Sequence, residues 1–223
     1  MKKGFTLAEV LITLGIIGVV AAMTIPTLVS KSQQRQHVVA WRKAYAEIYH
    51  ALRLMQADEA QPEDFVDSFK TSSEREYAYV AAISHYIKTS KICHEGKAVE
   101  EGCIPKAYPI YHLNGNKCLN NIGLKGGGAT CTIILDGTLI CFDEYMITFD
   151  VNGFTGPNTW GKDLFFANID FTNYAMYPAK GYKYGWGQAD GVIVPISVGN
   201  GTCKKANSDF GTGCSYYYLH NMP

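Results

Sequence analysis

The sequence predicts an α+β fold, in which a long N-terminal helix packs through its outer half on an antiparallel sheet. Three observations lead to this prediction: an apolar run at the N-terminus, an amphipathic continuation of that run, and a later region of short apolar segments separated by turns. The 223 residues include 20 basic and 20 acidic side chains, so the chain lacks the overall basic character of a nucleic-acid binder. Its 47% hydrophobic content excludes a chain that is disordered throughout. A mean hydropathy of -0.06 excludes a polytopic membrane protein.

The first element is the apolar run from Phe5 to Ile25, which contains one charged residue, Glu9. At about 1.5 Å per residue, a helix of this length covers roughly 30 Å, the thickness of the hydrocarbon core of a bilayer. Lys2 and Lys3 precede the run, and a basic flank of this kind holds an N-terminus in the cytoplasm. The sequence therefore predicts a single membrane span with the N-terminus inside and the remainder exported.

An ordinary secretory signal peptide is the alternative interpretation, because it also has a basic start and an apolar stretch. Its apolar region is about 7–15 residues long and ends at a cleavage site of small residues. Here the apolar run is longer and continues into a helical pattern. A carboxylate such as Glu9 costs roughly 2.5–3.5 kcal/mol at the centre of a spanning helix, which makes it a functional candidate.

The segment KKGFTLAEVLITLGIIGVVAAMTIPTL resembles the N-terminus of the type IV prepilin and type II secretion pseudopilin superfamily. The resemblance rests on a short basic leader, then Gly4 and Phe5, then Glu9 at the fifth position after the junction. It implies that a prepilin peptidase cleaves between Gly4 and Phe5, that the new amine is methylated, and that Glu9 acts in assembly. Pro26 matches a helix-breaking proline that is common in these subunits.

The resemblance implies a structural role rather than catalysis, and we expect no enzyme. The chain would begin as a precursor in the cytoplasmic membrane and would polymerise, with its own copies or with other pilins, into a pilus or pseudopilus. An inner-membrane assembly platform and its ATPase would be the further partners. The alternative is a minor or tip pilin, or a membrane-anchored binding module, that recognises DNA, a surface or a secreted substrate.

The predicted organisation is a leader over residues 1–4, a membrane and filament-core helix over 5–25, an amphipathic continuation over 26–58 and a pilin-like ectodomain over 59–223. Apolar residues recur at spacings of three and four in the continuation, which indicates one buried helical stripe: Val38, Trp41, Tyr45, Ile48, Leu52 and Met55. At Pro26 we expect a kink or local melting, because proline removes one helix hydrogen bond.

Within the ectodomain, the sequence indicates a short helix over 63–70 and a second helix that begins with a capping box of Ser73 and Glu76. The dipeptide Asp136-Gly137 between two apolar runs predicts a β-hairpin, and the following EYMITFDV predicts a third strand. Together they form an antiparallel meander from residue 131 to 151. Beyond residue 153 we expect turns with at most short strands.

The seven cysteines of an exported domain indicate disulfides, with one thiol left over. Cys93 with Cys103, and Cys203 with Cys214, each close a short loop, and the second loop resembles the C-terminal disulfide loop of many pilins. A two-residue turn at Asp136-Gly137 would place Cys131 and Cys141 on opposite faces of the hairpin, so we expect Cys118 to bond one of them. A zinc site is the weaker alternative, since its residues lack paired metal-ligand spacing: Cys93, His94, Cys103, His112 and Cys118.

One further stretch suggests a cofactor. Asp150, Asn152 and Gly153 begin like a calcium loop, and Asp163 could supply another ligand. The pattern departs from an EF-hand, because its glycine comes at the fourth position and Gly161 replaces the closing glutamate. The longer segment FDVNGFTGPNTWGKDLFF resembles one found in many prepilin-like ectodomains, and some pseudopilins bind calcium in their C-terminal loops. A weak calcium site and a simple turn-rich connection both stay open.

Overall fold

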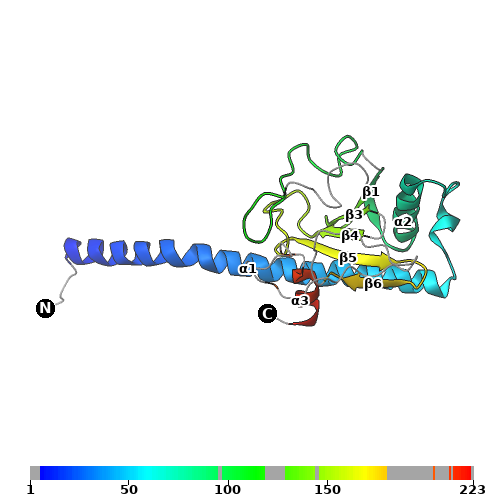
Figure 1. Cartoon of the computed structure of the whole chain (residues 1–223). Coiled ribbons are helices and arrows are strands. Elements are labelled where there is room, and N and C mark those ends of the chain that lie inside the picture. The colour runs from blue at the N-terminus through cyan, green and yellow to red at the C-terminus, as the bar shows by residue number, and fades with distance from the viewer. Residues whose placement is uncertain are drawn as a thin grey trace. The chain divides into compact units, whose positions relative to one another are not determined.

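The computed structural model describes residues 6–94, 97–118, 129–143, 146–179, 203, 211 and 213–221 (Figure 1). The chain divides into two compact units, Met1–Gln36 and His37–Pro223, and each is described by itself. The helix α1, Leu7–Ala57, supplies the described part of the first unit and continues into the second. It ends one residue before the predicted boundary of the amphipathic continuation, residue 58.

In the first unit, α1 exposes apolar side chains on all sides, as a helix suited to lipid or to other helices does. The hydroxyls of Thr13 and Thr24 donate to the carbonyls of Glu9 and Val20, four residues earlier, at 3.0 and 2.9 Å. These bonds satisfy the two hydroxyls within the helix, which an apolar surrounding requires. The helix continues through Pro26 without a break, so the expected local melting does not occur there, and the kink that was expected instead of it stays a prediction.

The second unit is built on a six-stranded antiparallel sheet in which the strands follow one another in sequence order. The strands are β1 Thr89–Cys93, β2 Thr130–Ile134, β3 Leu139–Asp143, β4 Met146–Asp150, β5 Leu164–Asp170 and β6 Ala175–Pro178. The predicted meander is therefore confirmed as β2 to β4. The expectation of at most short strands beyond residue 153 is wrong, because β5 is the longest strand of the sheet.

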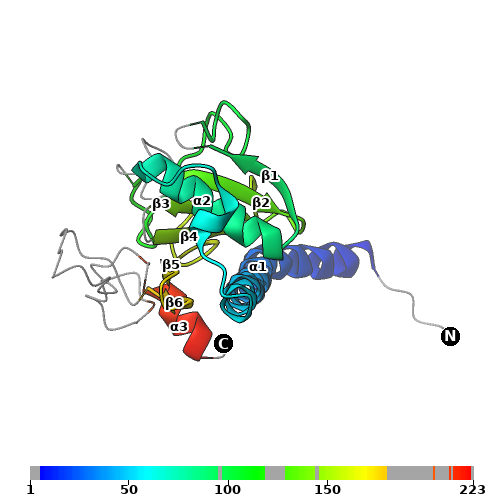
Figure 2. The same cartoon turned by 90° about the vertical axis from the view of Figure 1, so that its right-hand side faces the viewer.

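The remaining helices are the 3₁₀ helix η1 Pro62–Phe65, α2 Ser72–Tyr86 and α3 Cys214–His220. Figure 2 shows α2 against the sheet near β2 and β3, with α3 near β5 and β6. A capping box does begin α2, but it is formed by Thr71 and Glu74, two residues before the predicted pair.

Both faces of the sheet are buried. One face packs against α1 and α2, where Trp41 lies in the core with its ring 4.9 Å from Phe149 and 5.0 Å from Phe165. The other face is covered by a second cluster that includes Trp160, Phe166 and the cysteines of β1 to β3. All seven residues of β5 are buried as a result.

The β2–β3 hairpin differs from the prediction by one residue. Its loop contains three residues, Leu135 to Gly137, and the Gly137 N–H donates to the Ile134 carbonyl at 3.0 Å. Gly137 has a φ of 90°, which fits a type I turn followed by a glycine bulge. The extra loop residue places Cys131 directly opposite Cys141, and the two form a disulfide. The prediction that these cysteines do not pair is therefore wrong.

Candidate functional site

The start of α1 is closed by a reciprocal pair of side chains. The Thr6 N–H and hydroxyl both donate to the Glu9 carboxylate, at 2.9 and 2.7 Å, and the Glu9 N–H donates to the Thr6 hydroxyl at 3.3 Å. This is a capping box, and it holds a negative charge at the positive end of the helix dipole. The sequence analysis missed the role of Thr6, although the spacing Thr-x-x-Glu is its signature. Gly4 and Phe5 lie outside the described residues.

Among the described residues, α1 is the one helix that is long and apolar enough to cross a membrane, with a mean hydropathy of 2.2 over its most apolar window. Lys31 and Arg35 follow the apolar part and are exposed. They lie four residues apart, so their side chains share one face of the helix.

The C-terminal helix α3 binds the second half of α1 through hydrogen bonds that backbone carbonyl groups of α3 and its C-cap accept from side chains of α1. The Trp41 indole N–H donates to the Ser215 carbonyl at 3.1 Å. The Arg42 guanidinium donates to the carbonyls of Tyr218 at 2.7 Å and Asn221 at 2.9 Å. An arginine that binds the last carbonyls of a helix also stabilises the negative end of its dipole.

Three disulfides connect the second unit: Cys93–Cys103, Cys131–Cys141 and Cys203–Cys214. The first and third are the pairs that loop length indicated. Because Cys131 and Cys141 bond each other, the predicted bond from Cys118 to one of them is wrong; Cys118 is buried in the same cluster. The zinc alternative is also removed, since Cys93 and Cys103 are joined to each other.

The β4–β5 connection contains the residues predicted to bind calcium. Asp150 and Asp163 are both fully buried. The two Asp163 oxygens accept the N–H groups of Asn158 and Thr159, each at 2.7 Å. Asp150 accepts the Asn152 N–H at 3.2 Å through one oxygen and the Tyr108 hydroxyl through the other. Burial raises the pKa of Asp150 well above its ordinary value and also raises that of Asp163.

These contacts provide a test of the calcium prediction. Calcium takes six to eight oxygen ligands, typically with several carboxylates among them. The amide oxygens of Asn152 and Asn158 are buried without a donor, which would suit a cation. However, all four carboxylate oxygens of Asp150 and Asp163 already accept hydrogen bonds from N–H or O–H groups. The positive ends of these donors would repel a cation. The donor set does not fit a calcium site, and calcium at Asp150, Asn152 and Asp163 stays a sequence prediction.

The same connection supports the C-terminal disulfide. A Cβ atom on Gly161 would lie 2.5 Å from the Cys214 sulfur, and one on Gly211 would lie 2.5 Å from the Trp160 carbonyl oxygen. Both glycines also have positive φ values, of 79° and 101°. A side chain at either position would therefore push the β4–β5 connection away from the segment that contains Gly211 and Cys214. This indicates a structural role for the two glycines.

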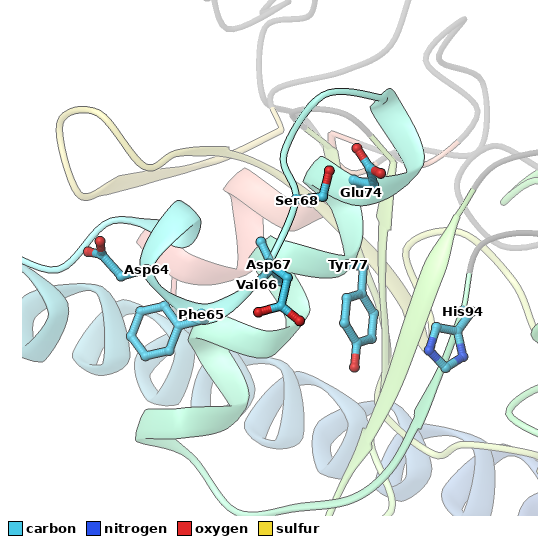
Figure 3. Close-up of a pocket in the computed structure, with 8 residues that line it drawn as sticks. All are labelled: Asp64, Phe65, Val66, Asp67, Ser68, Glu74, Tyr77 and His94. Carbon is cyan, nitrogen blue, oxygen red and sulfur yellow. The ribbon is translucent and has the colours of Figure 1, made fainter.

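A cleft of about 760 Å³ lies between η1, α2 and the end of β1. We call it the acidic cleft, and its lining residues are Asp64, Phe65, Val66, Asp67, Ser68, Glu74, Tyr77 and His94. Figure 3 shows the Asp67 carboxylate between the rings of Phe65 and Tyr77. Hydrogen bonds from the backbone of Thr71 and Lys70 hold the pKa of Glu74 below its ordinary value, so this carboxylate is an anion at neutral pH.

Comparison with known proteins identifies the N-terminal segment. The family model of the prokaryotic N-terminal methylation motif matches residues 1–25. This motif is the type IV prepilin-type signal, and it characterises structural pilin subunits rather than a class of enzyme. The long apolar helix, the antiparallel sheet and the disulfides make the fold an α+β, pilin-like one. No curated protein and no solved structure matches the chain.

Proposed function

We propose that this chain is a structural subunit of a type IV pilus or of a type II secretion-type pseudopilus. The observation that carries the proposal is the methylation motif at residues 1–25, whose residues from Leu7 onward form the apolar first part of α1. A substrate of prepilin peptidase needs both features, a cleavable basic leader and a helix that remains in the membrane after cleavage. A conventional signal peptide would instead be lost together with its apolar stretch.

The proposed sequence of events begins in the cytoplasmic membrane, with the N-terminus inside and the second unit outside. Prepilin peptidase cleaves between Gly4 and Phe5, and the new amine is methylated. An assembly platform and its ATPase then move the subunit into a filament of its own copies or of related pilins. The apolar residues Phe5 to Ile25 leave lipid and form the filament core.

Glu9 has a defined place in this proposal. Removal of the leader creates a cationic amine at Phe5, one helical turn from the Glu9 carboxylate. An unpaired carboxylate is costly in an apolar surrounding, and a cation brought against it offsets much of that cost. The pair formed with the amine of a neighbouring subunit would fix the register of assembly. The capping box with Thr6 keeps the carboxylate at the start of α1, where such an amine can reach it.

The cleavage step is tested by mass analysis of the chain purified from membranes. We expect the mature chain to start at Phe5 and to carry one methyl group on its amine. Loss of Lys2 and Lys3 leaves 18 basic residues against 20 acidic ones, so the formal net charge changes from 0 to -2. A chain that starts at Ala21 or later would show conventional signal cleavage and would contradict the proposal.

A further inference from the structure

The acidic cleft stands out because the chain as a whole is neutral. Seven acidic residues gather between residues 58 and 76, against the two bases Lys70 and Arg75: Asp58, Glu59, Glu63, Asp64, Asp67, Glu74 and Glu76. Three of the seven, Asp64, Asp67 and Glu74, line the cleft itself. Two of these three already accept backbone hydrogen bonds, Asp64 from Gln61 at 2.7 Å and Glu74 from Thr71 at 2.8 Å. Among the described residues, none donates a backbone hydrogen bond to Asp67.

The walls of the cleft are aromatic. The Tyr77 and His94 rings stack with centroids 4.8 Å apart, and the Glu101 carboxylate lies 3.1 Å from the His94 Nδ1. The Phe65 ring also packs against the His85 ring, with centroids 5.2 Å apart. The Asp67 carboxylate lies in the space between Phe65 and Tyr77 (Figure 3). Carboxylates beside aromatic faces form the arrangement that recognises guanidinium and ammonium groups, through ion pairing together with cation–π attraction.

We propose that this cleft is an interface between subunits, and that it receives Lys31 and Arg35 of a second copy of this chain. The inference rests on the proposed function, because it names the neighbour that a polymerised subunit contacts. A planar guanidinium can bind Asp67 with two N–H groups while it stacks on a ring, and an ammonium cannot do both. Arg35 is therefore assigned to the centre of the cleft and Lys31 to its rim.

We choose Lys31 and Arg35 because the other lysine and arginine side chains of α1 already bind groups within their own chain. Arg42 binds the carbonyls of α3, Lys43 binds Asp136 at 2.6 Å, and Arg53 binds Gln56 at 2.6 Å. Lys31 and Arg35 are exposed, share one face of the helix, and form no such contact within the described residues. In the proposed filament, we take the α1 helices of successive copies to pack in parallel and to be displaced along the helix axis. The C-terminal end of α1 in one copy then lies beside earlier turns of α1 in another copy. The cleft residues follow soon after that end in the chain, so they come near those earlier turns.

Charge exchange in the full chain tests this contact in cells that lack the wild-type subunit. The variants are Asp67→Arg, Arg35→Asp and the two combined, and the readout is the ratio of filament-bound to membrane-bound chain. Each single variant brings like charges together, so incorporation should fall by about tenfold or more, and the double variant should recover. Glu63→Arg is the matched control, since Glu63 is an exposed acid of η1 that does not line the cleft.

The outcomes separate this inference from the proposed function. Normal incorporation of Asp67→Arg beside normal wild-type filaments would overturn the inference alone. Loss in both single variants without recovery in the double variant would also overturn it, because another partner would then fill the cleft. Absence of the wild-type chain from every filament would overturn the proposed function and this contact with it. Unchanged disulfide maps of the variants confirm that they fold.

A second measurement does not depend on substitution. A carbodiimide joins a carboxylate to an amine that touches it, with loss of water. Treated wild-type filaments should yield a cross-linked dimer in which the peptide containing Asp64 or Asp67 is joined to the peptide containing Lys31. A dimer in which these peptides are joined only to other sites would contradict the assignment.

Discussion

At the level of single residues, Glu9 caps α1 in the structure and has a proposed role in assembly, and one substitution can separate the two. Its carboxylate accepts two hydrogen bonds from Thr6, so Glu9→Ala removes the side-chain half of the capping box together with the charge. Glu9→Gln keeps an acceptor for the capping box and removes only the charge. Loss of one partner from a buried ion pair costs about 3–5 kcal/mol, which corresponds to roughly a hundredfold or more in assembly.

We therefore expect Glu9→Gln and Glu9→Ala to be cleaved at Gly4 and inserted normally, while neither enters filaments. The measurement is the amount of each variant in sheared filaments, compared with its amount in the membrane. If Glu9→Gln assembles as well as the wild type while Glu9→Ala does not, Glu9 acts only as a helix cap.

The buried carboxyl groups of the β4–β5 connection make stability depend on pH. The pKa of Asp150 is raised by burial and by the neighbouring charge of Asp163, so the folded chain holds this proton more tightly than the unfolded chain does. The stability that Asp150 contributes is therefore complete below its ordinary pKa of 3.8 and is lost as pH rises toward the folded value. Across that window the loss is about 1.4 kcal/mol per pH unit.

The variant Asp150→Asn tests this, because it removes the titrating group with little change in shape. Its thermal midpoint, relative to that of the wild type, should be lowest near pH 4 and should rise as pH rises. Asp170→Asn, at another buried aspartate that binds Asn173, serves as the control. A constant difference between Asp150→Asn and the wild type from pH 4 to 8 would refute the assignment.

At the scale of elements, the sequence predicts those parts that have a clear period. The stripe from Val38 to Met55 identified the helix, and its predicted members Trp41, Ile48, Leu52 and Met55 are fully buried. The strand β5 has no such signal, because the sheet is covered on both faces and every β5 residue is buried. A run without alternation between polar and apolar residues is compatible with a buried strand or with an irregular connection.

The hairpin shows why cysteine pairing could not be derived from the sequence. The dipeptide Asp136-Gly137 fits a two-residue turn, but the structure uses Leu135 as well and places Gly137 in a bulge. One extra loop residue moves every following side chain to the other face of the strand. The wrong prediction that Cys131 and Cys141 do not pair came from this one residue. The predictions of Cys93–Cys103 and Cys203–Cys214 used only the length of the loop that each bond closes.

At the scale of the whole molecule, the two units divide the work in the proposed subunit. The first unit carries the methylation motif and the apolar face that leaves lipid for the filament core. The second unit is a disulfide-linked domain whose sheet is covered on both faces, as suits a domain exposed to the cell exterior. The acidic cleft is a feature of that domain that no periodic pattern revealed, since its residues come from η1, the connection after it, α2 and the position that follows β1.

If this chain is a filament subunit, it is present among the proteins of sheared filaments. Filaments from cells that express the chain at its natural level would be purified, and their proteins quantified with N-terminal peptides included. We expect the chain to be present and to begin at a methylated Phe5, abundantly if it is a major subunit and in small amounts if it is a minor one. A processed chain that stays entirely in the membrane while filaments form without it would show that it is not a filament subunit.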